Sequence, residues 1–198
     1  NGCLSNTLVQ SLSDPSAPPV VATGTTTICD GASVNISATG ATTYSWDQGV
    51  GAGANQTVSP STTTTYTVTG MTAGCTGSDV ITITVNPVPT VVATGTTTIC
   101  DGASVTISGS GATTYSWDQA LGAGASQTVS PSSTTTYTVT GATAGCSSTD
   151  QVTVTVNPIP TVTAIGGTTI CDGTSTPLNA TGASTYSWDQ GLGAGASQ

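Results

Sequence analysis

The hexapeptide TYSWDQ occurs three times in this chain, at residues 43–48, 114–119 and 185–190. These copies hold all three tryptophans of a chain that contains no phenylalanine. In an alternating β pattern, the tyrosine and the tryptophan point to one face and the serine between them to the other. The hexapeptide is therefore either one aromatic core built three times or an aromatic binding platform displayed three times.

The whole chain repeats itself with a spacing of 71 residues. We expect repeats at 18–88 and 89–159, the N-terminal half of a further repeat at 160–198, and the C-terminal end of a preceding repeat at 1–17. A segment cut from a longer array is the expected origin of this pattern, and two complete domains with ragged ends are the alternative. Three sets of residues define the spacing: Cys29, Cys100 and Cys171; Trp46, Trp117 and Trp188; and Pro18, Pro89 and Pro160.

The composition excludes several classes of function. The chain has no lysine, arginine or histidine, and nine acidic residues give it a formal charge of −9. Without cations it cannot neutralise phosphates, so we expect no nucleic-acid partner. No run of about 18 apolar residues is present, so we expect no membrane insertion. Serine and threonine hydroxyls lack a histidine or lysine to activate them, so we expect no catalytic residues and no enzyme.

Short alternating runs rich in threonine and valine predict β-strands throughout. In the first repeat, apolar residues alternate with polar ones at 34–38, 44–46, 66–68 and 81–85. Six or seven such runs per repeat, separated by glycine, proline, asparagine and aspartate, predict an all-β chain of tandem Ig-like β-sandwich domains. The proline-rich links at 87–89 and 158–160 are short and stiff, so we expect the domains to be arranged as a rod.

The order of motifs resembles a known family. The segments ICDGASVTIS, GATTYSWDQ, TTTYTVTG, GC and VTVTVNP resemble the tandem Ig-like, PKD-like repeats of Bacteroidota cell-surface adhesins, including gliding-motility adhesins exported by the type IX system. The resemblance covers nearly the whole chain. It implies a structural stalk segment of a long extracellular adhesin or surface fibre, which holds an adhesive tip away from the cell.

The resemblance also implies partners: neighbouring repeats of the same long chain, other copies in a fibre, and an unidentified surface or glycan ligand. The alternative is a repeated low-affinity carbohydrate- or surface-binding module that acts by avidity. Solvent-exposed aromatic rings along a groove would favour this alternative, whereas buried rings favour the stalk.

We expect the aromatic residues to form the structural core. A small sandwich without phenylalanine needs one large residue between its sheets. The expected core residues are Trp46, Trp117 and Trp188, together with Tyr66 and Tyr137, whose hydroxyls should bond to the backbone.

The recurring aspartates are expected to form turns. Asp30, Asp47 and Asp79 recur as Asp101, Asp118 and Asp150, and aspartate commonly bonds its own backbone in turns. Calcium is the alternative, since carboxylate oxygens suit it. The loops CDGAS and WDQG lack the carboxylate density of a dedicated calcium loop, so we expect no metal site and no cofactor.

Two cysteines per repeat indicate disulfides in an extracellular chain. Pairing within a repeat would join Cys29 to Cys75. An Ig-type strand order instead places these two residues at opposite ends of a domain, farther apart than the roughly 7 Å between Cα atoms that a disulfide allows. That order favours Cys29–Cys146 between successive repeats, and both pairings stay open. Cys100 would then pair beyond residue 198 and Cys75 and Cys3 before residue 1, and Cys171 is a further candidate.

Overall fold

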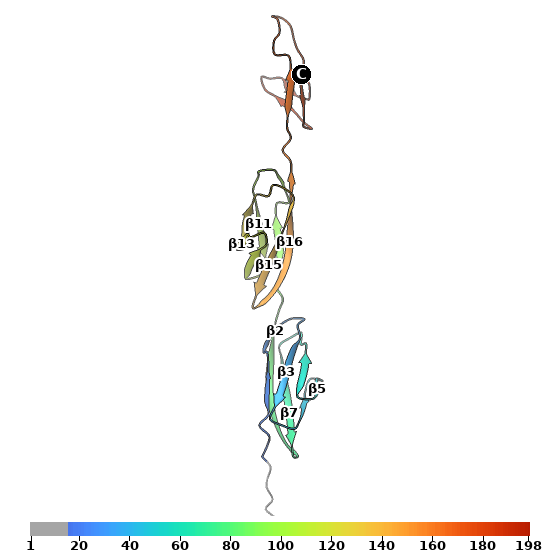
Figure 1. Cartoon of the computed structure of the whole chain (residues 1–198), viewed down its shortest axis with the longest axis vertical. Helices are drawn as coiled ribbons and strands as arrows, with labels where there is room; N and C mark the ends of the chain where they lie inside the picture. The colour runs from blue at the N-terminus through green and yellow to red at the C-terminus, as the bar shows by residue number, and fades with distance from the viewer. Residues whose placement is uncertain (1–15) are drawn as a thin grey trace, which may run out of the picture. The chain divides into compact units, whose positions relative to one another are not determined.

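The computed structural model describes residues 16–198, and all its regular elements are β-strands (Figure 1). Among these residues, no helix has the length and hydropathy needed to cross a bilayer. Most of the expected preceding repeat at 1–17, including Cys3, lies outside the described residues.

Residues 16–88 form an Ig-like β-sandwich of two sheets. A three-stranded sheet has the order β1–β3–β6, and a five-stranded sheet has the order β2–β8–β7–β4–β5. This order, with hairpin neighbours in one sheet and a first strand shared between both, is that of an Ig-like domain. The strands are β1 (Val21–Gly24), β2 (Thr27–Cys29), β3 (Val34–Thr39), β4 (Thr43–Trp46), β5 (Gly51–Ala52), β6 (Asn55–Val58), β7 (Thr64–Thr72) and β8 (Cys75–Asn86).

The first strand changes sheets partway along its length. β1 pairs antiparallel with β3, whereas β2 pairs in parallel with the end of β8. A Cβ atom at Gly24 would lie 2.8 Å from the carbonyl oxygen of Asn35, so glycine permits the close approach at the end of β1. The change of sheet places Cys29 opposite Asn86, at the last residue of β8.

The second repeat has the same architecture. Its sheets have the orders β14–β11–β9 and β10–β16–β15–β12–β13. Here too the short second strand, β10, pairs in parallel with the last strand, β16. The strands are β9 (Val92–Gly95), β10 (Thr98–Cys100), β11 (Val105–Ser110), β12 (Thr114–Trp117), β13 (Gly122–Ala123), β14 (Ser126–Val129), β15 (Thr135–Thr143) and β16 (Cys146–Asn157).

Residues 160–198 form two small sheets. β17 pairs with β18, and β19 pairs with β20, both antiparallel. Counterparts of the long strands β7 and β8 are not found in this segment. The strands are β17 (Thr163–Gly166), β18 (Leu178–Thr181), β19 (Ser187–Trp188) and β20 (Gly193–Ala194).

The core of the first sandwich lies between its two sheets. Buried and exposed side chains alternate along β3 and β7, as the sequence predicted. The most deeply buried side chains there are Ile36, Val68 and Ile83. Ile107, Val139 and Val154 are their counterparts 71 residues later and are equally buried.

The chain divides into two compact units that do not follow the 71-residue spacing. The first contains the described residues up to Val92, together with Ser110–Ser116 and Thr140–Thr149. The second contains Ala93–Gly109, Trp117–Val139 and Asp150–Gln198. The repeat boundaries expected after residues 88 and 159 therefore stay a prediction.

Candidate functional site

Two of the three tryptophans are buried between sheets. Trp46 ends β4 and is 4% exposed, and Trp117 ends β12 and is 5% exposed. The indole Nε1 of Trp46 donates a hydrogen bond of 3.0 Å to the carbonyl oxygen of Gly53, and Trp117 does the same with Gly124. Burial therefore leaves no unpaired polar atom on either ring, and both occupy the positions expected of core residues.

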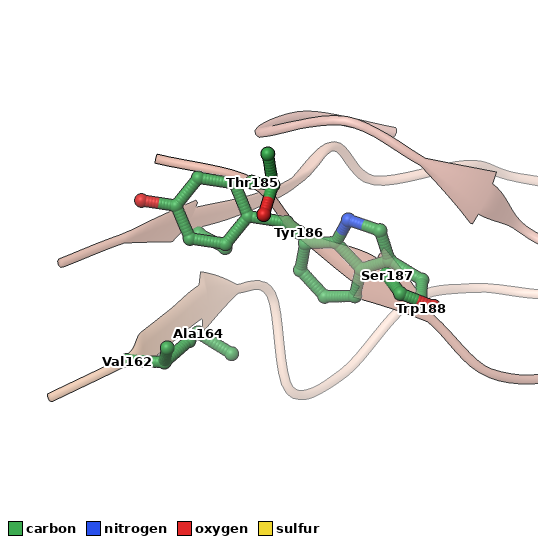
Figure 2. A pocket seen from close by; sticks show the side chains of 7 residues that line it. Val162, Ala164, Thr185, Tyr186, Ser187 and Trp188 are labelled. Atoms are coloured by element: carbon green, nitrogen blue, oxygen red, sulfur yellow. The ribbon is translucent and has the colours of Figure 1, made fainter. Parts of the chain in front are cut away.

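The third tryptophan has a different environment. Trp188 is half-buried in β19, and its Nε1 donates a bond of 2.9 Å to the carbonyl oxygen of Gly195. With Tyr186 it lies on one side of a hollow of about 240 Å³. Val162 and Ala164 lie on the other side (Figure 2). The local bond of the buried copies is thus kept while the ring stays partly accessible.

The tyrosines play two different roles. Tyr66 and Tyr137 are each 5% exposed, which places their rings in the core as expected. Burial raises the pKa of the Tyr66 hydroxyl, and the nearby Asp47 carboxylate adds to the rise. The hydroxyl-to-backbone bond predicted for this pair is found instead at the hexapeptide tyrosines. The Tyr44 hydroxyl donates to the carbonyl oxygen of Ala41 and accepts from its amide, both at 2.7 Å.

Two recurring aspartates bond strands that are distant in sequence, rather than only their own turns. The amide of Ala22 donates to Asp79 Oδ2 at 2.8 Å, and the amide of Thr67 donates to Asp47 Oδ1 at 2.8 Å. The Ala22 amide, followed by that of Val80, lowers the pKa of the Asp79 carboxyl below its usual range. Asp79 thus fastens β1 to β8, a role that the sequence did not predict because the partner is 57 residues away.

The same bonds recur in the second repeat. The amide of Ala93 donates to Asp150 Oδ2 at 2.8 Å, and the amide of Thr138 donates to Asp118 Oδ1 at 2.9 Å. Hydrogen bonds from Ala93 and then Gln151 lower the pKa of Asp150. Within residues 16–198, no three histidine, cysteine or acidic side chains come together as metal ligands would.

One disulfide joins cysteines from successive repeats. Cys29, at the end of β2, is bonded to Cys146, the first residue of β16. Their Cα atoms are 5.6 Å apart, although the residues are 117 apart in sequence. This is the pairing that the Ig-type strand order favoured over Cys29–Cys75. Both cysteines belong to the first compact unit.

The remaining described cysteines have other environments. Cys100 and Cys171 are exposed thiols, at the positions that correspond to Cys29. Cys75 is half-buried at the start of β8. The partners proposed for these residues outside the chain stay predictions.

A tight turn presents Cys146 to its partner. Ala144 and Gly145 both have positive φ angles, 51° and 82°, in the two-residue turn between β15 and β16. Positive φ at both central residues is typical of the type I′ turn, whose twist matches that of a hairpin. The Asn86 side-chain amide donates a hydrogen bond of 2.8 Å to the carbonyl oxygen of Ala144. The end of β8 is thereby held against the turn that carries the disulfide.

The disulfide is well shielded on one side. Cys146 is 2% exposed, and its sulfur lies 3.8 Å from the carbonyl oxygen of Asn86. The sulfur of Cys29 lies 3.9 Å from the carbonyl oxygen of Gly145. A bonded sulfur has no proton to donate, so these are packing contacts. The chemistry of this site is that of a covalent link between segments far apart in sequence.

Comparison with known proteins gives structural likeness alone. No family model matches the chain, and no curated protein matches it. Among solved structures, an I-band fragment of titin is 14% identical over 85% of this chain and 77% of its own, with a TM-score of 0.41. Three N-terminal domains of the outer capsid protein Hoc of bacteriophage RB49 are 16% identical over 83% of this chain and 67% of theirs, with a TM-score of 0.38. The amphioxus IgVJ-C2 molecule is 14% identical over 65% of this chain and 99% of its own, with a TM-score of 0.32.

Proposed function

We propose that this chain is a structural segment of an extracellular stalk, in which tandem Ig-like sandwiches hold an adhesive tip away from the cell. The observation that carries the proposal is the Cys29–Cys146 disulfide, which covalently joins a strand of one repeat to a strand of the next. Disulfides persist mainly in oxidising surroundings, which supports an extracellular location.

The contacts of the recurring side chains support a building role. The rings of Trp46 and Trp117 are buried in the core, and the carboxylates of Asp79 and Asp150 bind backbone amides of neighbouring strands. In the two complete sandwiches the motif's tryptophan is used inside the fold, which is better explained by construction than by display. The charge of −9 would also keep neighbouring copies apart in solution.

The finer assignment rests on the sequence resemblance alone. It describes a PKD-like surface adhesin of the Bacteroidota, exported by the type IX system and used in gliding motility. In that role the partners are other repeats of the same chain and other copies in a fibre, and calcium would be an optional ligand.

A second candidate function is a repeated carbohydrate-binding module. A shallow hollow of about 400 Å³ beside Tyr44 is lined by threonines 42 and 43 and by Ala52. A hollow of about 340 Å³ occupies the equivalent place beside Tyr186. Hydroxyls beside a partly exposed aromatic ring suit a sugar, and many weak copies would act by avidity.

Small-angle X-ray scattering and a glycan array together test these functions on the whole oxidised chain. The twelve-residue strand β16 spans about 40 Å at roughly 3.3 Å per residue, so two sandwiches joined end to end exceed about 80 Å. We expect a maximum dimension above that value and no glycan binding. A maximum dimension near that of one sandwich would contradict the stalk, and glycan binding that Tyr44→Ala weakens would favour the binding module.

A further inference from the structure

We propose that the Cys29–Cys146 disulfide removes residues 30–145 from the path that carries tension along the chain. In the oxidised chain, tension between the two ends therefore cannot draw residues 30–145 out into extended chain. This inference deepens the proposed stalk function and rests on it for its biological role. The mechanical behaviour itself follows from covalent connectivity.

The argument begins with the closed loop. Tension applied at the two ends of the chain reaches Cys29 along the backbone, crosses the disulfide and continues from Cys146. The two residues are 117 apart in sequence, so the strands from β3 to β15 all lie inside the loop that the disulfide closes. Unfolding of any strand inside a closed loop adds nothing to the distance between the chain ends.

The strands that flank the disulfide on this path are already extended. β1 and β2 precede Cys29, and the twelve residues of β16 begin at Cys146. A strand rises about 3.3 Å per residue, close to the limit of roughly 3.6 Å for a fully stretched chain. Tension therefore finds little slack in these strands.

Strand pairing holds both ends of the disulfide in place. Cys29 is fixed by the parallel pairing of β2 with the end of β8, from Thr27 opposite Thr84 to Cys29 opposite Asn86. The bond from the Asn86 side chain to the carbonyl oxygen of Ala144 holds the turn before Cys146. These hydrogen bonds hold the backbone on both sides of the covalent link, which itself carries the tension between Cys29 and Cys146.

The test is to stretch the whole chain between handles on its two ends in an optical trap. Three proteins are compared: the natural chain, C29S/C146S, and C100S/C171S. The last is a matched control, because it removes two exposed thiols at positions equivalent to Cys29 and keeps the disulfide. At roughly 3.4 Å per residue, the crosslink withholds about 400 Å of contour length. We expect the C29S/C146S variant to gain that length on full unfolding, and the other two proteins to lack it.

Reduction of the natural chain gives a second measurement that needs no substitution. Dithiothreitol transfers two electrons and two protons to the disulfide, which becomes two thiols, while the reagent closes to its own cyclic disulfide. We expect this treatment to release the same length of about 400 Å.

Two outcomes would overturn the inference. One is an oxidised natural chain that extends as far as C29S/C146S, and the other is a reduced chain that gains no length. Failure of the stalk function would be seen differently, as a compact scattering profile or glycan binding in a chain that still withholds its contour length.

Discussion

Residues 16–88 and residues 160–198 carry the same aromatic motif but bury it to different extents. The local bonds are alike: Trp46 donates to the carbonyl oxygen of Gly53 at 3.0 Å, and Trp188 donates to that of Gly195 at 2.9 Å. Trp46 is nevertheless 4% exposed, whereas Trp188 is half-buried and lines an open hollow.

The difference shows what the hexapeptide can and cannot determine. The motif is enough to form a short strand, a turn and the indole bond, because all their partners lie within ten residues. Burial needs segments farther along the chain as well, among them the long strands β7 and β8. β7 pairs with β4 so that Val68 lies opposite Trp46, and neither long strand has a counterpart in residues 160–198. The core is therefore completed by segments distant in sequence.

Replacing a buried tryptophan should have the largest effect on this contrast. Trp46→Ala should lower the free energy of unfolding of its sandwich by about 3–5 kcal/mol, since it removes the largest side chain between the sheets. Trp188→Ala should lower the free energy of unfolding by much less than this, because the ring of Trp188 is only half-buried and loses fewer packing contacts. Urea denaturation followed by far-ultraviolet circular dichroism measures both.

Trp117→Ala is the matched control for this comparison. Its ring is as buried as that of Trp46, at 5% exposure, so its loss should cost a similar amount. Equal effects of Trp46→Ala and Trp188→Ala would show that burial by β7 and β8 is not what stabilises the first sandwich.

Local patterns in the sequence were sufficient to predict most strands but not their distant partners. The alternation of Val34, Ile36 and Ala38 correctly predicted β3 and the face that it buries. β2 was missed, because three residues are too few for a periodic pattern and its parallel partner β8 lies far along the chain. The same limit explains why the bond from the Ala22 amide to Asp79 was not predicted.

The cysteines illustrate the boundary between pattern and topology. Spacing alone left two pairings open for Cys29, and only a three-dimensional strand order distinguished them. The type I′ turn that presents Cys146 uses Ala144 at positive φ, where asparagine or glycine is the usual signal. An alanine gives no such signal in the sequence.

A smaller effect is expected at a tightly packed glycine of the first sandwich. Gly70, in β7, lies opposite Tyr44, and a Cβ atom there would lie 2.6 Å from Val20 Cγ2 and 2.7 Å from Ala41 Cβ. Gly70→Ala should therefore cost about 1–3 kcal/mol of unfolding free energy through overpacking. Thr69→Ala, at the exposed neighbouring position, is the control and should change little. A neutral Gly70→Ala would mean that this corner of the core can relax.

The smallest effect should come from the carboxylate that fastens β1 to β8. Hydrogen bonds from the Ala22 and Val80 amides lower the pKa of Asp79, so the folded state binds the proton less readily than the unfolded chain does. The stabilisation by Asp79 is therefore present above the usual carboxyl pKa of about 3.9 and is lost as the pH falls through the lowered value.

Asp79→Asn should lower the melting temperature slightly at pH 7, and the difference in melting temperature from the natural chain should close towards pH 2. Melting curves across this range measure the difference, with Asp30→Asn as a control that removes the same charge at an exposed turn. If Asp30→Asn shows the same difference in melting temperature from the natural chain, and that difference also closes towards pH 2, then net charge and not the bond to Ala22 governs the acid response.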